Sequence, residues 1–224
     1  MALHGMAENN AQQIEWEAWL RAGHPLPGEE AHLDLMPFGR TSARAAREHG
    51  TVGKDFREAS VFIGIEPDGR FAMIERTLGG GVHGGQMALP GGRREAGESL
   101  LDCALREWRE ELGLGSDVVP LHQPVALTEV HVAPSRFVVR PFVAPVCLPD
   151  ALNPDPLEVA RVHRVALLDV MDSGRRTVQK VHAGGGQGFT IHAPGFALPR
   201  VPFIWGATAM MLAELSAWGR QWSR

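Results

Sequence analysis

Three glutamates, Glu107, Glu110 and Glu111, lie close together in the middle of the sequence. If this stretch is helical, its 3.6 residues per turn place all three carboxylates on one face. Like charges at this spacing repel one another by up to about 0.5 kcal/mol per close pair. The cluster is therefore either a solvated acidic surface or a site that binds a cation. Carboxylate oxygens are the ligands that Mg²⁺ and Mn²⁺ prefer, and these ions join carboxylates to phosphate groups.

A glycine-rich loop, "PGGRREAGE", comes directly before this stretch and contains Gly91, Gly92 and Gly97. Glycine has no side chain, so its backbone can approach a ligand closely. The N-terminus of a helix also favours anions. A glycine-rich loop is a weak signal alone, but together with the acidic face it predicts a site for a metal-bound phosphate.

The helix that carries the glutamates is well marked at both ends. Ser99 and Asp102 fit a capping box, and Gly113 suits a left-handed C-cap, so a helix is expected over residues 99–112. Its apolar residues fall on one side, roughly 120° from the glutamates. These residues are Leu101, Ala104, Leu105, Trp108 and Leu112. The helix is thus predicted to bury one stripe and to present the carboxylates at the edge of that burial.

Other segments alternate short apolar runs with turn signals, which predicts strands flanked by a few helices. Residues 59–65 and 70–76, joined by the turn signal "EPDG", predict a hairpin, and residues 78–98 predict a loop. Because regular βαβ alternation is missing, the order of elements predicts an α/β fold of the α+β type, a mixed sandwich. The remaining expected elements are strands at 125–130, 137–146 and 162–168, a hairpin at 176–191 and a closing helix at 205–218.

The N-terminal part is expected to form an extension, residues 1–50, which contains an amphipathic helix at 11–22 and packs on the main domain, residues 51–224. The 224-residue chain has 44% hydrophobic and 21% charged residues, which is typical of a protein with its own core. Its net charge of −4 gives no basic excess for nucleic acid or a membrane surface. No secretory signal or membrane-spanning run is expected. The two cysteines match no zinc spacing, which favours a reduced, cytoplasmic protein.

The spacing around the glutamates resembles the signature of the Nudix hydrolase superfamily. Gly92 is followed after five residues by Glu98, and after seven more by the run from Arg106 to Leu114, "REWREELGL". The resemblance implies a Nudix fold, in which a mixed β-sheet is sandwiched between α-helices. It also implies hydrolysis of a nucleoside diphosphate linked to another group, with Mg²⁺ or Mn²⁺ as cofactor.

The resemblance assigns roles by matching positions. Glu107, Glu110 and Glu111 would ligate the divalent metals. Arg106 would pair with Glu98 and hold the loop against the helix. Gly91 and Gly92 would keep the loop open to the diphosphate.

Four further segments resemble the coenzyme A pyrophosphatase branch of that superfamily. They are "HGGQMALPGG", "LTEVHVAPSRFVVRPFVAP", "PDPLEVARVHRVAL" and "IWGATAMMLAEL". The branch cleaves the diphosphate of coenzyme A to 4′-phosphopantetheine and adenosine 3′,5′-bisphosphate. In this chain the glycine loop is one residue shorter than is usual for the branch, and Leu89 replaces its usual phenylalanine. ADP-ribose, a dinucleotide or a nucleoside triphosphate therefore stays open as the substrate, as does a nucleotide sensor without catalysis.

A second group of residues is expected around the substrate. Glu158 is a candidate for a metal or base role, and Glu107 or Glu110 is an alternative base. Arg76 is expected to contact a phosphate, His83 and Gln86 to hydrogen-bond the substrate, and Arg136 to contact a 3′-phosphate. A homodimer is implied only by the resemblance to the family.

Overall fold

The computed structural model describes residues 22–37, 56–78, 83–132, 135–183 and 188–222. In this part of the chain, eight strands form one mixed sheet and three strands form a second, smaller sheet. The helix predicted over residues 11–22 lies outside the described residues, apart from residue 22, which is in a turn. The division of the chain at residue 50 stays a prediction.

The main sheet is built around two long strands, β1 (Arg57–Ile65) and β7 (Phe137–Pro145), which pair in parallel along their whole lengths. β1 also forms the predicted antiparallel hairpin with β2 (Arg70–Arg76), and β2 pairs on its other edge with β8 (Val159–Ala166). The short strands of this sheet are β3 (Met87–Ala88), β4 (Gly91–Arg93), β5 (Val125–Ala126) and β6 (Val130–Val132).

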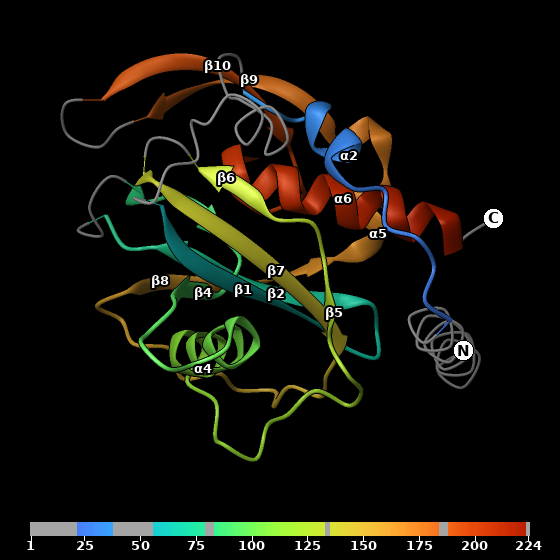
Figure 1. Cartoon of the computed structure of the whole chain (residues 1–224). Helices are drawn as coiled ribbons and strands as arrows, with labels where there is room; N and C mark the ends of the chain where they lie inside the picture. The colour runs from blue at the N-terminus through green and yellow to red at the C-terminus, as the bar shows by residue number, and fades with distance from the viewer. Residues whose placement is uncertain (1–21, 38–55, 79–82, 133–134, 184–187, 223–224) are drawn as a thin grey trace, which may run out of the picture.

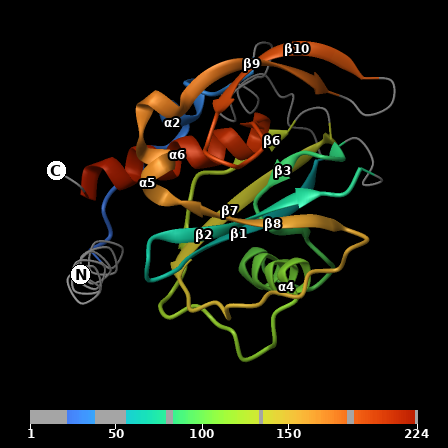
Figure 2. The same cartoon turned by 180° about the vertical axis from the view of Figure 1, so that it is seen from behind.

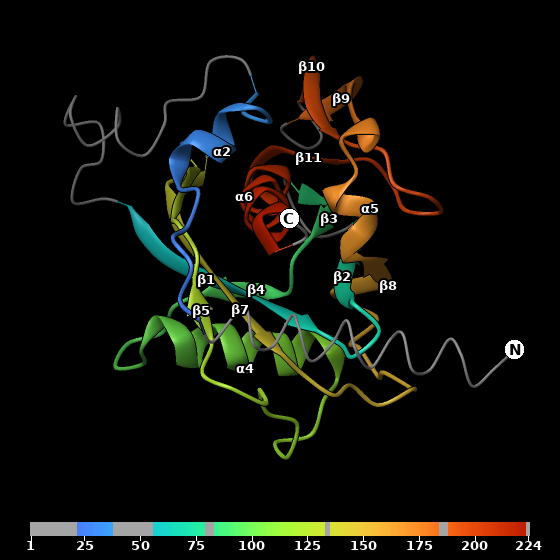
Figure 3. The same ribbon diagram turned by 90° about the vertical axis from the view of Figure 1, so that its right-hand side faces the viewer.

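Helices cover both faces of the main sheet (Figures 1 and 3). One face carries α4 (Leu100–Leu112), and the other carries α6 (Gly206–Trp222). The shorter elements on the α6 side are α2 (Glu29–Leu33), α5 (Leu167–Met171) and the 3-10 turn η3 (Ser173–Arg175). The small sheet consists of β9 (Arg176–Ala183), β10 (Phe189–Phe196) and β11 (Ile204–Trp205). The predicted arrangement of a mixed sheet between helices is confirmed.

Alternation along β1 explains why α4 and α6 pack on opposite faces, because successive side chains of a strand point to opposite sides. Ile63 and Ile65 lie in the core with α6. Phe62 lies in the core with α4, where its ring centroid is 5.0 Å from that of Trp108. Trp108 is therefore a core residue that fixes the rotation of α4 about its own axis.

Two of the predicted elements, the loop at 78–98 and the strand at 125–130, are wrong in their boundaries. The expected loop over residues 78–98 contains β3 and β4, because Gly91 and Gly92 pair with Val61 and Ser60 of β1. The strand expected over residues 125–130 is divided into β5 and β6. Its middle leaves the ladder because the Thr128 backbone N–H donates a hydrogen bond of 2.9 Å to Glu214 instead of to a strand.

The later elements are shifted by a few residues from their predicted ranges. The strand expected at 162–168 begins earlier, as β8, and its last two residues already belong to α5. Trp205 belongs to β11, where it pairs with Gly195 of β10. The closing helix α6 begins at the next residue and continues to Trp222. No helix in the described ranges is long and apolar enough to cross a membrane.

The buried carboxylate of Glu214 fastens α6 to two other parts of the chain. It accepts hydrogen bonds from the Thr128 side chain at 2.7 Å and from the Gly28 backbone N–H at 3.2 Å, and it lies 3.3 Å from His32 Nε2. Burial raises the pKa of Glu214, but the contacts with His32 and Thr128 outweigh burial and hold the pKa below 4.5. The segment before α2 is thereby tied to the main core.

We expect Glu214→Gln to lower the free energy of unfolding at pH 7 by about 3 kcal/mol, because it removes one partner of a buried charged network. The folded pKa lies below the ordinary value of 4.5. The carboxylate therefore stabilises the fold above that pH, and its contribution is lost as the pH falls through the folded pKa. Urea unfolding near neutral pH and at about pH 3.5 measures the free energy of unfolding of variant and wild type. We expect these two free energies to differ less in acid than near neutral pH. An equal difference at both pH values would contradict this assignment, and exposed Glu30→Gln serves as the control.

Candidate active site

Helix α4 presents Glu107 and Glu111 to the glycine loop, and its ends are fixed by residues at its own boundaries. The Asp102 backbone N–H donates a 3.1 Å hydrogen bond to the Ser99 side chain, and Gly113 takes the left-handed conformation with φ of 64°. Both predicted caps are confirmed. Because Trp108 and Leu112 are buried against the sheet, the carboxylates of the neighbouring turns lie at the edge of that burial.

Glu111 is the most buried of the three glutamates, with 4% of its side chain exposed. The Gly91 backbone N–H donates to Glu111 Oε2 at 2.8 Å, and Arg76 Nη1 donates to Oε1 at 3.5 Å. Burial nevertheless dominates and raises the pKa of Glu111 to about 7. Arg76 therefore offsets the burial of this carboxylate only in part, and a divalent cation beside it would favour the ionised form, because an opposite charge does so.

Glu107 lies beside Glu111 and close to the other glycine of the pair. Its Oε1 accepts a 3.0 Å hydrogen bond from Arg106 Nη1, and burial is the main cause that raises its pKa. A Cβ atom on Gly92 would lie 2.4 Å from the carboxyl carbon of Glu107. The missing side chain of Gly92 is thus required by the position of Glu107, a reason that the sequence did not reveal.

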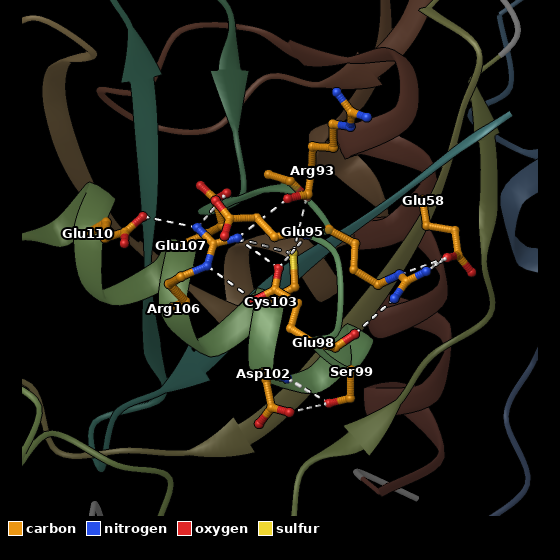
Figure 4. Close-up of polar contacts among 12 residues, drawn as sticks. Glu58, Arg93, Glu95, Glu98, Ser99, Asp102, Cys103, Arg106, Glu107 and Glu110 are labelled. Carbon is orange, nitrogen blue, oxygen red and sulfur yellow. Dashed lines mark hydrogen bonds and ion pairs between the residues drawn. The ribbon is translucent and has the colours of Figure 1, made fainter.

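Arg106 joins the loop to the helix, as the resemblance implied (Figure 4). Its Nη2 donates to Glu98 Oε1 at 2.9 Å and its Nε donates to Oε2 at 3.2 Å. These bonds lower the pKa of Glu98 to about 2, helped by the Glu95 backbone N–H. Glu98 thus stays ionised and holds the loop residues against the start of α4.

Glu110 differs from the other two glutamates, because 60% of its side chain is exposed and its Oε2 accepts a 3.1 Å bond from Arg106. Within the described residues, no three acidic, histidine or cysteine side chains converge closely enough to cage a metal ion. The donor set still fits Mg²⁺ or Mn²⁺, since such ions need only one or two carboxylates and complete their shell with water and phosphate oxygens. Glu107 and Glu111 are the two of the three that lie beside the glycine loop, and the metal roles of all three glutamates stay predictions.

Glu158 comes from a distant part of the sequence to the same place. It lies in the turn before β8, and its carbonyl accepts a 3.1 Å hydrogen bond from the Thr77 backbone N–H. Its charge contributes to the raised pKa values of both Glu107 and Glu111. The structure therefore brings this exposed carboxylate into electrostatic range of half-buried Glu107 and buried Glu111.

The structure connects His83 and Gln86 with Arg76 but places Arg136 elsewhere. His83 Nδ1 lies 3.2 Å from Gln86 Oε1. The Gln86 backbone carbonyl accepts a 3.1 Å hydrogen bond from the Arg76 backbone N–H. Arg136 lies in the β6–β7 connection, where its carbonyl accepts a 2.8 Å bond from the Arg57 N–H. Its described contacts do not reach the carboxylates, and its proposed contact with a 3′-phosphate stays a prediction.

The amide of Gly91 is a component of the site that sequence reasoning missed. Its N–H is the shortest described contact of Glu111, and a Cβ on Gly91 would lie 2.2 Å from the Ser60 carbonyl oxygen. A backbone donor leaves no mark of its own in a sequence. The only available signal was the glycine pair, which by itself indicates only room for a ligand.

Comparisons with solved structures give matches at low sequence identity. A MutT Nudix hydrolase from Burkholderia pseudomallei is 19% identical, with 72% of this chain and 98% of that chain aligned and a TM-score of 0.48. A Nudix hydrolase from M. smegmatis is 18% identical, with 84% and 91% aligned and a TM-score of 0.42. A C. elegans Ap4A hydrolase, solved as a binary complex, is 16% identical, with 51% and 83% aligned and a TM-score of 0.42. No curated protein sequence matches the chain significantly.

The family comparison is the decisive one. The sequence pattern of the NUDIX domain matches residues 55–182, which is more than half of the chain. That range contains the glycine loop, α4 and Glu158. The chain therefore belongs to the Nudix hydrolase family, whose members act on phosphorus-containing anhydrides and generally use divalent metal ions.

Proposed function

We propose that this enzyme cleaves the diphosphate of coenzyme A or its derivatives to 4′-phosphopantetheine and adenosine 3′,5′-bisphosphate, with Mg²⁺ or Mn²⁺ as cofactor. The observation that carries the pyrophosphohydrolase chemistry is the pair of half-buried and buried carboxylates, Glu107 and Glu111, held at the Gly91–Gly92 pair beside Arg76. The choice of coenzyme A is supported by the resemblance of the segments around His83, Ser135, Glu158 and Thr208 to the coenzyme A branch.

In the proposed reaction, a water oxygen bonds to one phosphorus while the bridging P–O bond breaks and the leaving phosphate departs with the bridging oxygen. Glu107 and Glu111 would hold the divalent ion, which would supply charge neutralisation for the diphosphate and a lower pKa for water. Arg76, whose Nη1 lies 3.5 Å from Glu111 Oε1, would offer its remaining guanidinium N–H groups to a phosphate oxygen. Glu107, Glu110 and Glu158 are the candidates that accept the proton from water.

The chain's own contacts prepare this arrangement before any substrate binds. Arg106 and Glu98 fix the loop, and the Gly91 N–H orients the Glu111 carboxylate. Such preorganisation lowers the reorganisation needed when charge develops in the transition state. Cys103 and Cys147 form no disulfide, and the exposed thiol of Cys147 favours a reducing compartment such as the cytoplasm.

The test is identification of the products by mass spectrometry after incubation with coenzyme A and Mg²⁺ or Mn²⁺, beside ADP-ribose, a dinucleotide and a nucleoside triphosphate. We expect coenzyme A to have the highest kcat/KM and to give the two named products. A chelator in excess should abolish turnover, which controls for contaminating phosphatases that need no metal. Much faster turnover of ADP-ribose than of coenzyme A would overturn the substrate assignment and leave the hydrolase class intact.

A further inference from the structure

Two leucines at the edge of the active site are almost fully exposed to water. Leu78 is 88% exposed and Leu157 is 82% exposed, more than any other large apolar residue that the structure describes. Single exposed leucines are common on protein surfaces. Two of them on adjoining segments beside a catalytic site are a different case, and hydrogen bonds join these two segments.

Thr77 connects the two leucines. Its side-chain hydroxyl donates a 2.9 Å hydrogen bond to the Leu157 carbonyl, and its backbone N–H donates to the Glu158 carbonyl at 3.1 Å. The Leu157 N–H in turn donates to Asp155 Oδ1 at 2.8 Å. The turn before β8 is therefore fixed against the residues that follow β2, and Figure 2 shows β8 running beside β2.

The two leucines also adjoin the proposed diphosphate site. Leu78 lies two residues after Arg76, whose guanidinium contacts Glu111. Leu157 directly precedes Glu158, whose charge acts on Glu107 and Glu111. The two segments that carry the leucines are therefore the same segments that bring Arg76 and Glu158 to the carboxylates.

The chemistry of the candidate substrates decides which substituent suits such a surface. In coenzyme A, the phosphopantetheine phosphate is followed, after one methylene group, by a carbon that bears two methyl groups. In ADP-ribose and in dinucleotides the corresponding position is a ribose with hydroxyl groups. Because the transfer of apolar surface out of water is favourable and roughly proportional to its area, two exposed leucines stabilise a substrate that carries a dimethyl group there.

We propose that Leu78 and Leu157 contact the dimethyl group of the pantetheine arm and thereby select coenzyme A over diphosphates that carry a second ribose. This inference rests on the proposed function, because it concerns the same reaction and the same site. An apolar contact favours the matching substrate by about 10- to 200-fold per group but rejects a hydroxylated analogue only weakly. Loss of the leucines should accordingly slow coenzyme A hydrolysis without affecting an analogue that lacks the methyl groups.

The experiment compares kcat/KM of the full-length enzyme with Mg²⁺ for coenzyme A, dephospho-coenzyme A and ADP-ribose. The variants are Leu78→Ser, Leu157→Ser and Leu168→Ser, the last of which changes a 63% exposed leucine on α5. We expect Leu78→Ser and Leu157→Ser each to lower kcat/KM about tenfold for both coenzymes, which share the dimethyl group. ADP-ribose hydrolysis, thermal unfolding and the Leu168→Ser variant should stay as in the wild type.

The outcomes separate this inference from the proposed function. If the wild type cleaves coenzyme A and the two variants cleave it equally well, only the role of the leucines is overturned. Equal losses for coenzyme A and ADP-ribose would also overturn it, because they would indicate a general disturbance of the site. If the wild type does not cleave coenzyme A, the proposed function fails and this inference fails with it.

Discussion

The Glu111→Gln variant is expected to fold as well as the wild type and to lose at least about a hundredfold in kcat. The side chain is 4% exposed, and burial raises its pKa to about 7, so the fold already disfavours its charge. Glutamine keeps the shape and an oxygen that can accept the bond from the Gly91 N–H. Metal binding contributes several kcal/mol to such reactions, and about 1.4 kcal/mol corresponds to a factor of ten in rate.

Steady-state kinetics over a Mg²⁺ titration measure the loss of kcat, and thermal unfolding measures the stability of the variant separately. Glu30→Gln removes an exposed glutamate on α2 and should leave both quantities unchanged. Wild-type turnover of Glu111→Gln at every Mg²⁺ concentration would remove Glu111 from the site. A large loss of stability would mean instead that the ionised carboxylate is structural.

The Gly92→Ala variant is expected to lose activity about ten- to a hundredfold with little change in stability. The new Cβ would lie 2.4 Å from the carboxyl carbon of Glu107 and 2.5 Å from each of its oxygens. The end of a long side chain can move away at low cost, so the fold adapts by displacing Glu107. A displacement of about 1 Å in a catalytic group can reduce the rate about a hundredfold.

Gly69→Ala is the matched control for this variant. Gly69 lies in the β1–β2 turn with φ of 74°, and no atom lies within 4 Å of the position that a Cβ would take, so alanine strains the backbone there without touching the site. We expect it to cost about 1 kcal/mol of stability and no activity. The explanation through Glu107 fails if Gly92→Ala loses activity only in proportion to its unfolded fraction.

The sequence was sufficient for the elements whose causes are local. The ends of α4 follow from Ser99, Asp102 and Gly113, which act on backbone groups within the same turn. The β1–β2 hairpin follows from apolar runs around one turn, and the acidic face of α4 follows from its spacing along the helix. The Arg106–Glu98 pair was implied by the resemblance of the spacing to the Nudix signature, and the two residues are eight positions apart.

Only the tertiary structure decided how the three glutamates differ. A shared helical face says nothing about their surroundings, which come from Gly91 and Arg76 for Glu111, and from solvent and Arg106 for Glu110. The split of the expected strand into β5 and β6 has the same origin. Thr128 donates to Glu214, which lies on α6, 86 residues later in the sequence.

The sequence by itself thus determined that this chain carries an acidic helix behind a glycine loop, and that the helix belongs to a Nudix hydrolase. The tertiary structure decided which carboxylates are buried, why both glycines are required, and that Glu158 lies within electrostatic range of Glu107 and Glu111. The physical reason is that helix caps and periodicity depend on neighbours within a few residues. Burial, pKa shifts and the close approach of backbone to side chain depend on segments that meet only when the sheet has formed.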